Sequence, residues 1–110
     1  MSTLFKQLAT GGINAGMAAL SSKGRDQGKV YLVLAVEDRM LKLVDGKNRT
    51  LLKPKLKHRN HVKILGQMLS AEETESLINA DKDSREKDTF IRKTISLFLN
   101  KNQLDGNGGI

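Results

Sequence analysis

Short apolar runs alternate with loops rich in Gly, Asp and Asn between residues 16 and 66, a pattern typical of β-strands. The strongest run, at 30–36, is rich in β-branched residues and too short for a helix, so we expect a central strand there. Four shorter runs complete the set, at 17–20, 40–44, 49–52 and 62–65. Turns at 37–39 and 45–48 predict two successive hairpins, and Pro54 should end the fourth strand because it has no N–H to donate.

The apolar pattern changes to helical spacing after residue 66. Ser70 is followed three residues later by Glu73, the order of an N-terminal capping box, so we expect a helix over 71–79. A second helix is expected from residue 84 to about 100, with an apolar face that packs against the strands. That face comprises Ile91, Ile95 and Phe98, widened by Phe90, Thr94 and Leu97.

These elements predict a mainly-β fold, namely a five-stranded SH3-like barrel with a C-terminal extension of two helices. Five short antiparallel strands are too few for a broad sandwich, whereas a small barrel also hides the strand edges. The sequence therefore divides into four expected parts: a weakly ordered lead-in at 1–14, the barrel at 15–66, the helical extension at 67–100 and a flexible tail at 101–110.

Positive charge is concentrated in the part of the chain that is expected to form strands. The net charge is +7; residues 13–70 hold twelve basic and four acidic side chains, whereas residues 71–110 hold six basic and eight acidic ones. A polyanion is therefore the first partner to consider. Because the chain has no cysteine, we expect no disulfide and a cytoplasmic location. No apolar run approaches the roughly 20 residues that a membrane span requires, so no membrane partner is expected.

Two clusters of cations indicate a phosphate-binding surface. The first is a glycine-containing loop that comprises Lys23, Gly24, Arg25, Gly28 and Lys29. The second comprises Lys53, Lys55, Lys57, His58, Arg59, His61 and Lys63. In extended chain, every second residue from Lys53 to Lys63 would point the same way and form a cationic ridge. Two simpler interpretations stay open: the glycines serve only a tight turn, and the lysines only protect an edge strand from aggregation.

No group of residues in the sequence indicates catalysis, a metal site or a cofactor. His58 and His61 lack the cysteine or nearby carboxylate partners that would complete four metal ligands. The serines at 21 and 22 have no recognisable base beside them, and the glycines do not fit a nucleotide-binding loop, in which Lys is followed by Ser or Thr. Tyr31, the only tyrosine, is expected in the core rather than on a base-stacking surface.

The stretch from Ser22 to Val33 resembles a KOW motif, the loop-and-strand signature shared by several ribosomal proteins and the NusG transcription factors. The resemblance extends through residues 44–49 and 53–58, which are similar to small bacterial KOW-domain RNA-binding proteins and to a KOW-type large-subunit ribosomal protein of archaea and eukaryotes. It covers about residues 15–65. Many KOW motifs carry another glycine where this chain has residues 30–32, and this departure resembles the ribosomal subgroup more than the transcription factors.

This resemblance implies an SH3-like barrel that binds RNA. By position, Gly24 and Gly28 would shape the loop, and Lys23, Arg25 and Lys29 would face phosphate. The surface would be extended by Lys53, Lys55, Lys57 and His58, and Arg49 is a further candidate RNA-binding residue. We therefore expect a non-enzymatic, ribosome-associated protein that binds ribosomal RNA, with ribosomal proteins as further candidate partners. The alternative is a protein-interaction adaptor that uses the barrel and the C-terminal helices.

Overall fold

The structure, a computed structural model, describes residues 12–102. The expected lead-in up to residue 11 and the expected tail from residue 103 lie outside the described residues. The strands are β1 (Met17–Ser21), β2 (Val30–Glu37), β3 (Met40–Val44), β4 (Lys55–His58) and β5 (Val62–Gln67). A single 3-10 turn, η1 (Arg59–His61), separates β4 from β5, and two helices follow, α2 (Ala71–Asn79) and α3 (Ser84–Asn102).

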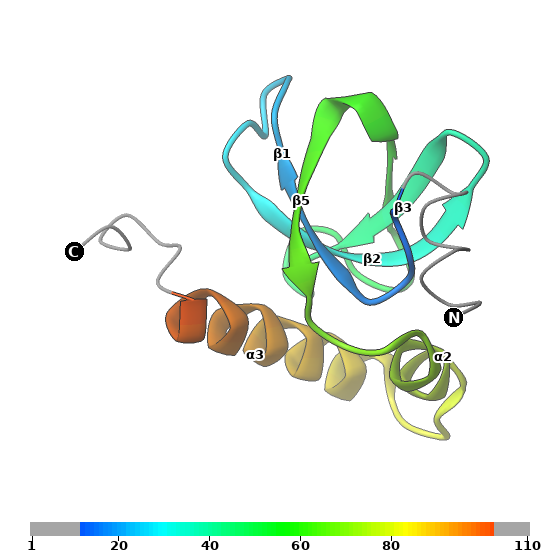
Figure 1. Ribbon diagram of the computed structural model, residues 1–110. Coiled ribbons are helices and arrows are strands. Elements are labelled where there is room, and N and C mark those ends of the chain that lie inside the picture. The colour runs from blue at the N-terminus through cyan, green and yellow to red at the C-terminus, as the bar shows by residue number, and fades with distance from the viewer. Residues whose placement is uncertain (1–11, 103–110) are drawn as a thin grey trace, which may run out of the picture.

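The five strands form one antiparallel sheet in the order β4-β3-β2-β1-β5. The sheet curves strongly, and α2 and α3 lie together along one side of it (Figure 1). A mainly-β fold with five antiparallel strands and two helices is therefore confirmed. The strand order ends at β4 on one side and at β5 on the other.

The central strand β2 is buried on both faces, which explains its uninterrupted apolar sequence. Tyr31 and Val33 belong to one hydrophobic cluster, and Leu32 and Leu34 belong to a second. The first cluster is completed mainly by Ile13, Met17, Ala19, Leu41 and Leu43, and the second by Val44, Leu69, Ile91 and Ile95. The expected core position of Tyr31 is confirmed, because the side chain is 2% exposed.

Both helices form where their sequences predict. The Ser70 side chain accepts a hydrogen bond from the Glu73 N–H, and the Glu73 carboxylate accepts one from the Ser70 N–H, so the capping box is confirmed. Ile91 and Ile95 pack on the sheet, as their spacing predicts. The prediction that Phe90 and Leu97 widen this apolar face is wrong, because their side chains are 47% and 68% exposed. The helix α3 also continues to Asn102, past the expected boundary at residue 100.

The fourth strand lies at Lys55–His58 and not at 49–52, so this prediction is wrong. The Leu51 N–H donates instead to the Asp88 carboxylate of α3 (3.0 Å), which takes this segment out of the sheet. Pro54 directly precedes β4, at the beginning of a strand, where the missing N–H costs little. The strand-forming segment also extends one residue past the expected boundary at residue 66, because β5 ends at Gln67.

Packing of α3 on β2 should supply much of the stability. The substitution Ile91→Ala removes a fully buried side chain and should lower the free energy of unfolding by about 3 kcal/mol. The control Leu97→Ala, on the exposed side of the same helix, should change it by less than about 0.5 kcal/mol. Urea denaturation followed by circular dichroism measures both values, and equal losses would contradict the described packing.

Candidate nucleic-acid interface

The β1–β2 loop, residues 22–29, is closed at its base by backbone hydrogen bonds. The Ser21 N–H donates to the Lys29 carbonyl (2.8 Å), and the Gly28 N–H donates to the Ser21 carbonyl (2.9 Å). Gly24 and Gly28 each have a φ of 93°, a conformation that favours glycine, so these residues shape the loop as expected. The N–H groups of Gln27, Gly28 and Lys29 all donate within or at the base of the loop, so the protein itself satisfies them.

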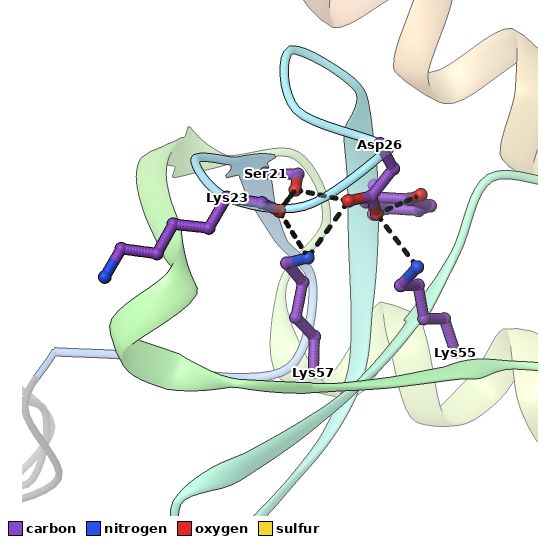
Figure 2. A network of polar contacts seen from close by, with 6 residues as sticks. Ser21, Lys23, Asp26, Lys55 and Lys57 are labelled. Atoms are coloured by element: carbon purple, nitrogen blue, oxygen red, sulfur yellow. Dashed lines mark hydrogen bonds and ion pairs between the residues drawn. The ribbon is translucent and has the colours of Figure 1, made fainter.

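The carboxylate of Asp26 lies at the centre of a polar network that ties this loop to β4 (Figure 2). It accepts hydrogen bonds from the Ser21 hydroxyl (2.8 Å) and the Tyr31 hydroxyl (2.7 Å). The Lys57 amine lies 3.0 Å from Oδ1, and the Lys55 amine lies 3.2 Å from Oδ2. The Lys57 amine also donates to the carbonyl of Lys23 (2.8 Å), so one buried lysine holds two points of the loop.

The network keeps Asp26 ionised although its side chain is only 10% exposed. Burial by itself raises the pKa of this carboxyl, but the hydrogen bonds from Tyr31, Lys57, Ser21 and Lys55 together outweigh burial and hold the pKa well below its usual range. The pKa of Tyr31 is raised by burial and by the neighbouring Asp26 carboxylate. The tyrosine therefore stays a neutral hydrogen-bond donor.

The prediction that every second residue from Lys53 to Lys63 forms one cationic ridge is wrong. The alternation holds within β4, but Lys55 and Lys57 turn toward the Asp26 carboxylate rather than toward solvent (Figure 2). The Lys57 side chain is only 9% exposed, so it is not available as a phosphate contact, and the Lys55 side chain is 25% exposed. The 3-10 turn η1 then interrupts the extended chain at 59–61.

The remaining expected contacts divide between two places. Lys23, Arg25 and Lys29 are exposed on loop 22–29, and the Lys23 side chain points away from the network (Figure 2). The base of this loop lies beside η1 and β5, because the Ser22 N–H donates to the His61 carbonyl (2.8 Å) and Leu20 pairs with Lys63. The segment from His58 to Lys63, in which the first residue, Arg59 and His61 are half-buried and the last is exposed, therefore runs past the base of the loop.

Arg49 and Lys53 are exposed on a different segment, the β3–β4 loop at residues 45–54. That loop is hydrogen-bonded to α3 through Leu51 and Gly46 rather than to loop 22–29. The structure therefore gathers the two expected clusters only in part.

The two histidines have a structural role in the turn. The His58 Nδ1 atom accepts a hydrogen bond from the Asn60 N–H (3.0 Å) and so caps η1, and the two imidazole rings lie 5.7 Å apart. Within residues 12–102 no group of three or more His, Asp or Glu side chains could hold a metal ion. No helix in the same part of the chain is long and apolar enough to cross a membrane.

Sequence reasoning missed Ser21 and Asp26 as parts of this site. One available signal was the position of Asp26, the single acidic residue between the cations of loop 22–29. A lone carboxylate among cations is a candidate internal counter-ion, and Lys57 could have been recognised as its partner only once the strand β4 was placed. No protein-family model matches the chain, and no curated protein matches it either.

The substitution Asp26→Asn should destabilise the protein, because it leaves the buried Lys57 amine without its counter-charge. At neutral pH the free energy of unfolding should fall by about 3 kcal/mol. The pKa of Asp26 is lower in the folded state, so its contribution is present above the unfolded-state pKa of about 3.9 and is lost as the pH falls through the folded-state value. The difference between wild type and variant should therefore shrink in acid.

A matched control is Glu37→Gln, which makes the same carboxylate-to-amide change in an exposed ion pair with Lys42 (3.4 Å). Its effect should stay below about 0.5 kcal/mol. Urea denaturation at a series of pH values measures both variants. The network would be refuted by an Asp26→Asn variant as stable as the Glu37→Gln variant at pH 7.

Proposed function

We propose that this protein is a non-enzymatic RNA-binding module of the KOW type, which binds ribosomal RNA in the cytoplasm as a ribosome-associated factor. In this proposal the curved sheet is an SH3-like barrel, and the β1–β2 loop is the KOW loop. Support for this assignment comes from the KOW-like residues at 22–33 and from their place in the fold, as a glycine-bent loop that enters the central strand β2.

The observation that carries the proposal is the clamp formed by Asp26 with Lys55 and Lys57. The clamp fixes the backbone of loop 22–29, while the side chains of Lys23, Arg25 and Lys29 stay exposed on it. A loop that is ordered before binding loses less conformational entropy when it meets a ligand. Three closely spaced cations on a fixed loop suit the phosphates of a nucleic-acid backbone.

The net charge of the Asp26 network also favours an anionic partner. Asp26 neutralises only one of the two lysines that contact it, so the network keeps a net positive charge beneath the exposed cations. The free protein therefore holds like charges close together, and their repulsion is relieved when phosphates bind. If the exposed cations served only solubility, loop 22–29 would not need to be fixed by the buried ion pair of Asp26 and Lys57.

A second candidate function is that of a protein-interaction adaptor, which a groove between α2 and α3 favours. The groove has a volume of about 640 Å³ and is lined by apolar side chains that include Leu77, Ala80 and Phe90. A pull-down from cell lysate with and without RNase separates the two functions. Partners that are lost after RNase treatment support RNA binding, and a stoichiometric protein partner that resists RNase supports the adaptor.

Neutralising the loop cations should weaken RNA binding without unfolding the protein. The triple variant Lys23→Ala, Arg25→Ala, Lys29→Ala changes only exposed side chains. The slope of log K against log salt concentration should become shallower by about one unit for each phosphate contact that is lost. Fluorescence anisotropy with a labelled stem-loop RNA measures this slope.

The matched control removes three exposed cations from the helical part, with the substitutions Lys82→Ala, Arg85→Ala and Lys93→Ala. Both triple variants lower the net charge equally, so a non-specific charge effect would weaken both to the same degree. Equal affinities and slopes for the two variants would rule out loop 22–29 as the contact. Wild-type binding that does not depend on salt would rule out phosphate recognition altogether.

A further inference from the structure

The β3–β4 loop at 45–54 carries three exposed cations, Lys47, Arg49 and Lys53, and its first half is ordered by one carboxylate. The Asp45 Oδ1 atom accepts hydrogen bonds from the backbone N–H groups of Lys47 (2.8 Å), Asn48 (2.9 Å) and Arg49 (2.8 Å). The one negative charge of the loop therefore faces its own backbone. The side chains of Lys47, Arg49 and Lys53 remain exposed to solvent.

Helix α3 holds the same loop at two further points. The buried Asp88 side chain is 7% exposed, and its Oδ1 atom accepts a hydrogen bond from the Leu51 N–H (3.0 Å). One turn further along the helix, the Arg92 guanidinium donates to the Gly46 carbonyl and to the Thr89 hydroxyl (3.0 Å). An acid and a base of α3 thus satisfy backbone groups of Gly46 and Leu51, which lie on either side of Lys47 and Arg49.

The loop backbone is pressed directly against the helix at Gly46. This residue has a φ of 77°, and a Cβ atom placed on it would lie 2.2 Å from the Asp88 carbonyl oxygen. Only glycine fits such a contact. Leu51 adds a partly buried side chain to the hydrophobic cluster that contains Ile91. The conformation of the loop therefore depends on α3 as well as on Asp45.

The beginning of this loop also lies near the Asp26 network. Val44, the residue before Asp45, pairs with Leu32, the residue after Tyr31, and the Tyr31 hydroxyl donates a hydrogen bond to Asp26. Loop 22–29, which leads into β2, and loop 45–54, which follows β3, therefore lie at the same end of the sheet.

We infer that loop 45–54 is a second RNA-phosphate contact and that α3 is the element that positions it, through Asp88 and Arg92. This inference rests on the proposed RNA-binding function and assigns a role to the helical extension. Lys47, Arg49 and Lys53 are the contact residues, and Asp88 and Arg92 are positioning residues that need not touch the RNA. The ligand chemistry is the same at both loops, a phosphodiester backbone met by exposed amines and guanidinium groups.

The contact is tested with the triple variant Lys47→Ala, Arg49→Ala, Lys53→Ala and a labelled stem-loop RNA. Binding at low salt should weaken by about tenfold or more, and the salt slope should become shallower by about one unit per lost contact. All three side chains are exposed, so the fold should persist, which circular dichroism verifies. An affinity and a slope equal to those of the wild type would overturn the second contact.

Positioning by α3 is tested with Arg92→Ala against Lys93→Ala, its neighbour on the same helix. Both substitutions remove one exposed cation, but only Arg92 bonds to loop 45–54. Arg92→Ala should weaken RNA binding more than Lys93→Ala does, and it should add nothing when the three loop cations are already absent. Equal effects of the two substitutions, or an effect of Arg92→Ala that persists in the triple variant, would overturn the positioning role.

The failure of this inference differs from the failure of the proposed function. If the wild-type protein does not bind the stem-loop RNA, both are wrong. If the wild type binds and the variants of loop 22–29 weaken binding while those of loop 45–54 do not, only the second contact is wrong.

Discussion

The buried carboxylate of Asp26 is the constraint on which the basic face of this protein depends. It joins Ser21 at the end of β1, Tyr31 in β2 and two lysines of β4. A buried ion is tolerated only when enough donors replace its lost water, and four side chains do so here. Glycines alone would leave loop 22–29 with many conformations. The Asp26 network instead fixes this loop against β4, a strand far along the chain.

This constraint divides the cations of the chain into two groups with different roles. Lys55 and Lys57 serve the structure, because their amines hold Asp26 and the loop backbone. Lys23, Arg25 and Lys29 stay exposed above them. Loop 45–54 shows the same division of roles. Asp45 and Asp88 accept hydrogen bonds from backbone N–H groups of the loop, while the cations of the loop are exposed to solvent. In both loops, acidic residues shape the backbone and basic residues stay exposed.

Secondary structure can be predicted from the sequence where the signal lies in neighbouring residues. The prediction fails where a residue far along the chain determines the conformation. The apolar run of β2 and the Ser70–Glu73 capping box are local, and both were placed correctly. The segment 49–52 has an equally strand-like pattern, but Asp88, 37 residues from Leu51, takes its backbone out of the sheet. The alternating lysines of β4 indicated a ridge, yet they face inward because Asp26 lies opposite. No pattern along the chain reveals that pairing in advance.

The most direct test of this account is the titration of the Asp26 carboxyl group by NMR. If four side chains hold the carboxylate in the folded protein, its carbon resonance should stay that of an ionised acid at pH values where exposed aspartates already titrate. The resonance should change only well below the usual aspartate range. A normal titration, with a midpoint near that of the exposed carboxyl groups, would show that Asp26 lies in water and that the clamp on loop 22–29 does not exist.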